Sequence, residues 1–233
     1  MPGRKPPVSF LISAEHASNQ VPESWRPLFA ESPDVLNSHR AWDPGSGELA
    51  RALNEALDAP LLEGRVTRLL VDLNRSASHP RRFSEFSRSL PEAQKKELVD
   101  HYWQPHWDRY GDYLDSLPGK IIHIACHSFS PAMDGKPRGT DIGLLYDPTR
   151  PLEAQYCRLL GTAMRGVLPD LTVHMNKPYR GVSNGMGQQH RRHYDDRRLI
   201  TLELEINQRL VARSIWKTCR QRIAEVIAET RAT

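Results

Sequence analysis

Short apolar runs alternate with longer amphipathic stretches along this chain. The apolar runs are too short for helices and are rich in β-branched residues, which predicts buried β-strands. They cover residues 8–13, 68–73, 120–126, 141–146, 171–175 and 199–206, with a further short strand expected at 60–63.

Apolar residues at helical spacing predict helices between these strands. The helices cover residues 46–57, 91–117, 152–167 and 211–229, and the second is expected to kink at Pro105. Strands that alternate with helices of this length are typical of a mostly parallel sheet with helices on both faces. We therefore expect a single α/β domain over residues 1–233. It should hold a mostly parallel mixed sheet flanked by helices, after a flexible lead-in at 1–7.

Composition narrows the function classes. The chain has 39% hydrophobic and 26% charged residues, and no apolar run reaches the roughly 18 residues of a membrane helix. The formal net charge is +4, but the arginines are scattered and no nucleic-acid-binding motif accompanies them. The cysteines lack metal-type spacing, which fits a reducing compartment. These features predict a cytoplasmic protein that binds neither nucleic acid nor membranes.

Residues that can carry out chemistry follow several of the predicted strands. His16 follows the first strand, and His127 follows the strand at 120–126. In α/β sheets ligands bind beyond the carboxyl ends of the strands, and neutral imidazole is a favoured zinc ligand. We therefore expect His16 and His127 to bind a metal, and we interpret the remaining histidines as structural or surface residues.

The third metal ligand is open between two carboxylates. Glu15 adjoins His16, and adjacent residues on a strand point to opposite faces. Asp43 lies just ahead of the predicted helix at 46–57, where it also fits a helix cap. Asp43 is the preferred ligand because Glu15 would need a turn to share a metal with His16.

Two further carboxylates share one face of the last predicted strand. Glu203 and Glu205 alternate with apolar residues, so both side chains point the same way. Buried charge is costly unless it is paired or metal-linked. One of the two is therefore a candidate general base, unless the strand is an edge strand with a solvated polar face.

Candidate substrate-binding residues lie in two segments. Asn74 and Arg75 follow the run at 68–73, and an arginine that binds a carboxylate through two hydrogen bonds suits an acidic substrate. Asp72 is expected to orient Arg75 or to contact the metal ligands. A glycine-rich loop that ends near residue 187 carries Asn176, Tyr179 and Arg180, and the sequence leaves open whether it closes over the substrate or is merely flexible.

Six short polar segments stand in order along most of the chain, from about residue 10 to residue 210. They are Ser13-Ala14-Glu15-His16-Ala17-Ser18-Asn19 with Pro22, Ala41-Trp42-Asp43-Pro44-Gly45, Arg68 with Asp72-Leu73-Asn74-Arg75, His127-Ser128-Phe129-Ser130-Pro131, Asn176 with Pro178-Tyr179 and Gly181, and Glu205-Ile206. Each is weakly specific alone. Their ordered combination resembles the N-formylglutamate amidohydrolase family.

The resemblance implies a zinc-carboxypeptidase-like fold of the phosphorylase/hydrolase type with one bound zinc ion. It implies that His16 and His127 are metal ligands and that Glu205, rather than Glu203, is the catalytic carboxylate. The carboxypeptidase relatives have a His-x-x-Glu metal motif, but Asn19 stands at the Glu position here. The identity of the third ligand therefore stays open.

The Asp-x-Asn-Arg segment also looks like that of aspartoacylase-type relatives. The Asn-Arg pair holds the substrate carboxylate in those proteins, so the resemblance implies this role for Asn74 and Arg75. It agrees with the role that the chemistry of arginine suggests for Arg75.

These observations predict a zinc-dependent hydrolase of carbon–nitrogen bonds other than peptide bonds, with a small acidic N-acyl amino acid such as N-formylglutamate as substrate. Glu205 is expected to move the proton of the attacking water, and Arg75 to hold the carboxylate. Arg68, or an arginine of 180–198, is expected to stabilise the oxyanion.

Other functions stay open on the sequence. A metallo-carboxypeptidase or amidase that acts on peptides would need a more open cleft. A non-catalytic small-molecule-binding protein of the same fold would lack stoichiometric metal. A cysteine hydrolase is disfavoured, because Cys126 and His127 are strand neighbours whose side chains point apart.

Overall fold

The fold is built on a six-stranded sheet, and the computed structural model describes residues 7–230. The strands in spatial order are β2 (Leu61–Glu63), β1 (Val8–Ala14), β3 (Lys120–Phe129), β8 (Leu199–Asn207), β6 (Ile142–Leu145) and β7 (Val173–Met175). The first four run parallel, β6 pairs antiparallel with β8, and β7 is parallel to β6. The predicted α/β class with a mostly parallel mixed sheet is confirmed.

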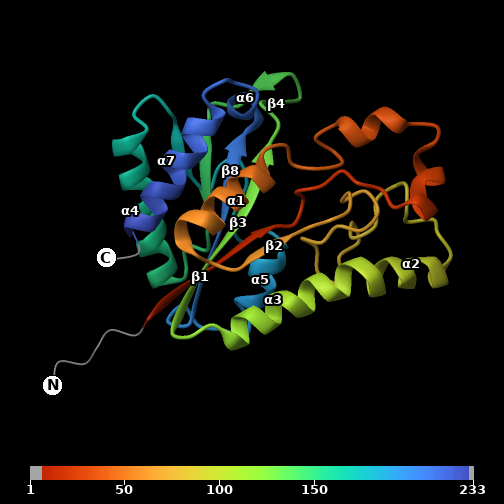
Figure 1. Ribbon diagram of the computed structural model, residues 1–233, viewed down its shortest axis with the longest axis horizontal. Coiled ribbons are helices and arrows are strands. Elements are labelled where there is room, and N and C mark those ends of the chain that lie inside the picture. Colours follow the sequence, from red (N-terminus) through yellow and green to blue (C-terminus); the bar gives the residue numbers. More distant parts are fainter. Residues whose placement is uncertain (1–6, 231–233) are drawn as a thin grey trace.

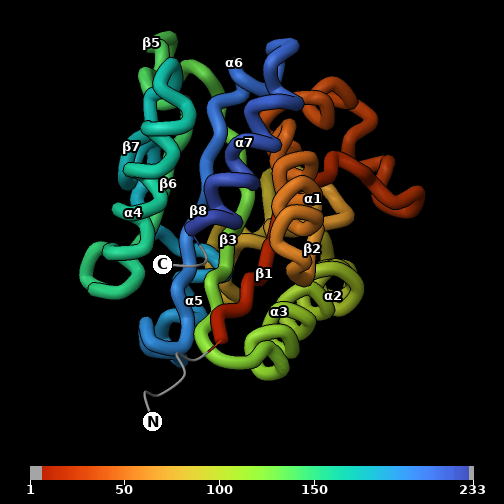
Figure 2. The backbone as a smooth tube through the Cα atoms, turned by 60° about the vertical axis from the view of Figure 1, so that its left-hand side comes forward, coloured from red at the N-terminus to blue at the C-terminus, as the bar shows by residue number. Residues whose placement is uncertain are grey.

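Helices cover both faces of this sheet (Figure 1; Figure 2). One face packs against α1 (Ser46–Leu57), α4 (Pro151–Val167) and α7 (Trp216–Glu229), and the opposite face packs against α3 (Gln104–Ser116) and α5 (Met186–His190). The remaining elements are η1 (Glu23–Phe29), η2 (Pro33–Asn37), α2 (Glu92–Leu98), η3 (Val99–Trp103), the β4 (Ala132–Met133) and β5 (Lys136–Pro137) hairpin, and α6 (Gln208–Val211). Among the described residues, no helix combines the length and apolar character needed to cross a bilayer.

Side-chain alternation separates apolar from polar residues on the central strands β1, β3 and β8. The residues facing α1, α4 and α7 are apolar and join the largest core cluster. The opposite face becomes polar toward the carboxyl ends of the strands, where it carries Ser13, His123, His127, Thr201, Glu203 and Glu205. The period-two pattern thus places a group of polar side chains on one face of an otherwise apolar sheet.

The prediction of a strand at 68–73 is wrong. The amides of Arg68 and Asp72 donate to the carbonyls of Ala41 and Arg82, which belong to loops and not to a neighbouring strand. The apolar side chains of this run fill a second core cluster under the segments that contain η1 and η3. An apolar run shows that a segment is buried, but it does not show that the segment is extended.

The long helix expected at 91–117 is present but irregular. It passes from α2 through the π-helical turn η3 into α3. Proline lacks an amide hydrogen, and its ring clashes with the carbonyl four residues earlier in a regular α-helix. The wider turn just before Pro105 accommodates that ring, which explains the irregularity.

The outcome also differs for the closing helix and for the strand at 171–175, and the lead-in is described only in part. The closing helix begins at Trp216 and not at residue 211, because α6 forms a separate short helix before it. The strand predicted at 171–175 exists, but it runs antiparallel to β8, so its carboxyl end points away from the edge where His127 lies. Of the predicted flexible lead-in, residues 1–6 lie outside the described residues, and the Pro7 carbonyl accepts a hydrogen bond from Lys120 N.

Candidate metal centre and active site

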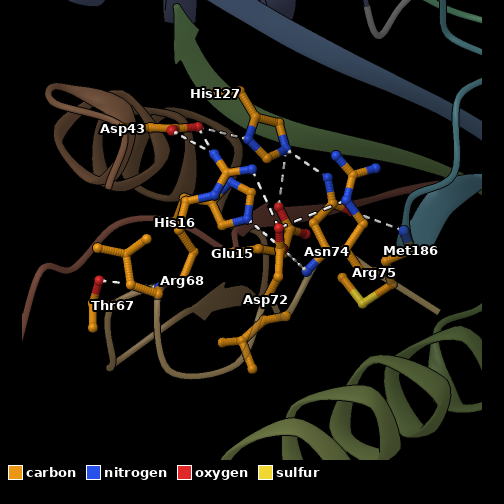
Figure 3. A network of polar contacts seen from close by, with 12 residues as sticks. Glu15, His16, Asp43, Thr67, Arg68, Asp72, Asn74, Arg75, His127 and Met186 are labelled. Carbon is orange, nitrogen blue, oxygen red and sulfur yellow. Dashed lines mark hydrogen bonds and ion pairs between the residues drawn. The ribbon is translucent and has the colours of Figure 1, made fainter. Parts of the chain in front are cut away.

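Three side chains from different parts of the fold converge at the carboxyl end of the sheet (Figure 3). His16 lies in the turn after β1, His127 lies on β3, and Asp43 precedes α1. Asp43 Oδ2 lies 3.3 Å from His16 Nδ1 and 2.9 Å from His127 Nδ1. One donor atom from each residue lies within 4.8 Å of the other two, and all three residues are buried. The structure therefore brings together the two histidines and the carboxylate predicted from the sequence.

The second ring nitrogen of each histidine faces another buried carboxylate. His16 Nε2 lies 2.7 Å from Asp72 Oδ1, and His127 Nε2 lies 3.1 Å from Glu15 Oε2. Histidines that bind metals usually donate their other N–H to a carboxylate or carbonyl, which fixes the tautomer and the orientation of the ring. Nδ1 of each ring thus faces Asp43 Oδ2, while Nε2 faces Asp72 in the case of His16 and Glu15 in the case of His127.

The alternative third ligand, Glu15, lies on the other side of the His127 ring. Its Oε2 faces Nε2 of that ring, whereas Asp43 faces Nδ1. A glycine at position 64 allows this placement, because a Cβ there would lie 1.9 Å from the Glu15 carbonyl oxygen. The geometry therefore favours Asp43 as the ligand and gives Glu15 the position of an outer partner.

Arg68 holds both of the aspartates that flank His16. Its guanidinium lies 3.2 Å from Asp43 Oδ1 and 3.2 Å from Asp72 Oδ2. Because Arg68 occupies Oδ1, Asp43 is left with Oδ2 pointing at the two imidazoles. The sequence predicted Arg68 as an oxyanion partner, and the structure shows it fixing the carboxylates at the floor of the site.

The buried carboxylates of the cluster are paired with imidazole and guanidinium groups. Burial alone would raise the pKa values of Asp43 and Asp72, but the nearby imidazoles and Arg68 hold both pKa values well below the usual range of an aspartate. The pKa of His127 is raised despite its burial, because Asp43 and Glu15 stabilise its protonated form. A buried group of carboxylates that favours positive charge on a ligand nitrogen is also an environment that favours a metal cation.

The donor set fits a divalent transition metal. Two imidazole nitrogens and one carboxylate oxygen are typical ligands of a catalytic zinc site, which keeps a further position open. A metal at this point would replace protons on the histidine Nδ1 atoms, and the carboxylates behind the rings would still receive the Nε2 protons. His16, Asp43 and His127 are thus the residues that would hold such an ion.

Glu205 stands beside this group on β8. It pairs in register with His127 across β3 and β8, and its side chain is buried. Glu205 Oε2 has no hydrogen-bond partner among the described residues. Burial, together with the negative charges of Asp43 and Glu203, raises the pKa of Glu205 to about 8, although His127 and Arg68 oppose the shift. An unpaired carboxyl with a pKa near neutrality has the properties of a general acid or base.

A pocket of about 560 Å³ opens directly onto these groups. Its lining includes His16, Asp43, Arg68, Asn74, Arg75, His127, Tyr179 and Glu205, all of them predicted from the sequence. Sequence reasoning missed other lining residues: His39, His79, Arg81, Ser128, Phe129, Ser130, Ser183, Asn184 and Gln208. Most of these lie on loops without regular spacing, although Ser128, Phe129 and Ser130 directly follow His127 and stand in one of the six ordered segments.

Asn74 and Arg75 are fixed by contacts with the glycine-rich loop. Asn74 Oδ1 accepts a hydrogen bond of 2.8 Å from Met186 N (Figure 3). Arg75 donates to the carbonyl of Asn184. Arg75 Nε also lies 3.6 Å from Asp72 Oδ2. Asp72 therefore contacts both His16 and Arg75, which are the two places where the sequence analysis expected it.

The three loop residues predicted to bind substrate have different positions. Tyr179 lines the pocket and accepts a hydrogen bond of 3.0 Å from Arg138. Asn176 and Arg180 are absent from the lining, and Arg180 is exposed. Asn176 Oδ1 instead accepts hydrogen bonds from Tyr146 N and Gly181 N, so this side chain shapes the turn that carries Tyr179.

Comparison with solved structures gives one informative similarity. The crystal structure of gene product Atu2144 from Agrobacterium tumefaciens matches at a TM-score of 0.78 and 28% identity, and the match covers 96% of this chain and 89% of that one. An N-acetylmuramoyl-L-alanine amidase, AmiC2 of Nostoc punctiforme, matches at a TM-score of 0.41 and 11% identity, over 97% and 95% of the two chains. A metallo-carboxypeptidase from Burkholderia cenocepacia matches at 0.42 and 12% identity, over 98% of this chain and 57% of that one. The last two similarities are too weak to support a conclusion about this chain.

The sequence comparisons give one match, to a family model. Comparison with curated proteins gives no match. The family model described as FGase, N-formylglutamate amidohydrolase, matches residues 8–212, a range that includes the converging histidines, Asp43, the Asn74-Arg75 pair and Glu205. The chain therefore belongs to the N-formylglutamate amidohydrolase family.

Proposed function

We propose that this protein is a zinc-dependent amidohydrolase that cleaves the amide bond of a small acidic N-acyl amino acid. Membership of the family supports a hydrolase of non-peptide carbon–nitrogen bonds. The observation that carries the metal dependence is the buried group of His16, Asp43 and His127, with donor atoms within 4.8 Å of one another. Bound there, a zinc ion would supply Lewis acidity toward the acyl carbonyl and toward water.

Glu205 has the role of the general acid and base in this proposal. Glu205 takes a proton from the attacking water and delivers it to the leaving nitrogen, while the new carbon–oxygen bond forms and the carbon–nitrogen bond breaks. For this role Glu205 must be ionised before the reaction. A zinc ion held by His16, Asp43 and His127 would offset the negative charges of Asp43 and Glu203. It would thereby lower the pKa of Glu205 toward the range of a base at neutral pH.

Arg75 and Asn74 supply the recognition of the substrate carboxylate. Both line the pocket. Arg75 is held by Asp72 and by the carbonyl of Asn184, and Asn74 is held by the backbone amide of Met186. A guanidinium held in this way binds a carboxylate without a large loss of side-chain entropy. Localisation in the cytoplasm remains part of the proposal, as does the absence of nucleic-acid and membrane partners.

The experiment that tests the function compares substrates on the zinc-loaded protein. We expect release of the free amino acid from N-formyl or N-acetyl derivatives of glutamate and aspartate, loss of that release with a strong chelator, and recovery after zinc is added back. N-acyl derivatives of uncharged amino acids should react more slowly. Equal rates on peptides and on N-acyl amino acids, or full activity in excess chelator, would contradict the proposal.

A further inference from the structure

A chain of buried polar groups runs from the candidate metal centre into the core of the sheet. Ser13 Oγ lies 2.6 Å from Glu15 Oε1 and 2.8 Å from His123 Nε2. His123 Nδ1 lies 2.9 Å from Tyr110 OH and 2.7 Å from Thr201 Oγ1. All five side chains are buried, with exposed fractions of 0–2%. Such groups are unusual on the inner face of a sheet, because a buried polar network has to be fully satisfied.

The directions of the hydrogen bonds between His123, Ser13 and Glu15 follow from which atoms can donate. Glu15 faces the hydroxyl of Ser13 with one oxygen and the imidazole of His127 with the other, and both of these neighbours are able to donate, so the Glu15 carboxylate is the acceptor. The single hydroxyl proton of Ser13 must therefore point at Glu15 Oε1. Ser13 Oγ then accepts from His123, which places the proton of this imidazole on Nε2.

The far end of the chain agrees with this assignment. Burial lowers the pKa of His123 to about 3, so the ring is neutral and carries one proton. With that proton on Nε2, Nδ1 is an acceptor with one lone pair, which the hydroxyl of either Tyr110 or Thr201 is able to engage. The donors His123 Nε2 and Ser13 Oγ consequently both point toward Glu15.

Glu15 connects this chain to His127. Its Oε2 lies 3.1 Å from His127 Nε2, and the other neighbour of this nitrogen is the Asn74 amide nitrogen at 3.3 Å. The Asn74 oxygen is already bonded to Met186 N, so Asn74 offers only a donor there. Asn74 Nδ2 is therefore the hydrogen-bond donor at Nε2, and Glu15 Oε2 lies at ion-pair distance without a hydrogen bond of its own. If Nδ1 binds a metal beside Asp43, the single proton of the ring is on Nε2, and Glu15 is the neighbour that can accept it.

We infer that Ser13 and His123 are positioning residues for the metal site: they fix the carboxylate of Glu15, which in turn sets the tautomer and orientation of His127. The inference depends on the proposed function, since it assigns a metal to His127 Nδ1. Neither residue touches the pocket, so both act only through Glu15.

The test measures zinc affinity and not activity. Ser13→Ala removes the donor to Glu15, and we expect the zinc dissociation constant, measured by competition with a chromophoric chelator, to rise by about tenfold, the lower end of the effect of outer-shell substitutions. Ser87→Ala is the matched control. Ser87 is equally buried, and its partner, the Leu69 carbonyl, keeps a second donor in Ser84. This control should leave zinc affinity unchanged.

A second readout does not require bound metal. Long-range ¹H–¹⁵N correlation spectra report which nitrogen of each histidine is protonated, and we expect His123 to carry its proton on Nε2 with and without zinc. A proton on Nδ1 of His123, or an unchanged zinc affinity in Ser13→Ala, would overturn the inference while the wild type still binds zinc. Failure of the wild type to bind zinc would overturn the proposed function as well. This outcome is distinguishable from failure of the inference alone, because it is observed in the protein without any substitution.

Discussion

Substitution of Glu205 by glutamine is expected to lower kcat by about 10³-fold, within the range usual for loss of a general acid–base group. Glutamine preserves the size of the side chain but neither accepts nor returns a proton. Glu205 has an unpartnered oxygen, lines the pocket and pairs in register with His127, so its carboxyl lies where the account places the base. Turnover and zinc content should be measured on the same preparation, and we expect zinc to remain bound.

Glu203→Gln provides the matched comparison. Glu203 lies on the same strand and the same face, and it also lines the pocket, but it pairs in register with Ala125 and not with His127. We expect its substitution to lower kcat less than tenfold, roughly the effect of removing one nearby charge. If Glu205→Gln retained wild-type kcat with zinc bound, Glu205 would not be the base.

Arg75→Met is expected to lower kcat/KM for an acidic N-acyl amino acid by about 100-fold. Hydrogen bonds to charged groups contribute about 1.5–3 kcal/mol, which corresponds to factors of about 10 to 150. The effect should largely disappear for a substrate in which the recognised carboxylate is replaced by a carboxamide. Kinetics on this substrate pair separate the loss of charge recognition from a general loss of activity.

Arg81→Met serves as the control for this substitution. Arg81 is exposed at the pocket lining, so its removal changes the net charge of the pocket by the same amount without removing the guanidinium that Asp72 and Asn184 hold. A similar fall in kcat/KM for both variants would indicate long-range attraction of the substrate. A fall restricted to Arg75→Met, and to the charged substrate, supports direct binding of the carboxylate.

The sheet was predictable because its side-chain pattern reflects burial on both faces. The strands at the first and last positions of the chain, and the run that contains His123, have apolar residues that only a central strand buries. Strand direction was not predictable, because an apolar run looks the same in either orientation. For that reason the sequence placed Asn176 at the active edge, whereas the antiparallel direction of β7 removes it from the pocket.

The two histidines were predictable from their positions after buried strands, whereas their outer partners were not. Asp72 lies within the run at 68–73 that was wrongly predicted as a strand, yet hydrogen bonds to loop carbonyls bring it to His16 all the same. Glu15 was considered only as a ligand, because sequence spacing does not show which side of a histidine ring a carboxylate will face. The chain through Ser13 and His123 depends on register between strands, which sequence alone does not supply.

The most direct test of this account is the zinc content of the purified protein and of two variants, His16→Ala and His127→Ala. The account predicts about one zinc ion per chain in the wild type and its loss in both variants. His101→Ala, which alters an exposed histidine outside the pocket, should keep the metal. A wild type that binds no zinc even after zinc is supplied, or variants that retain it, would contradict the assignment of this site.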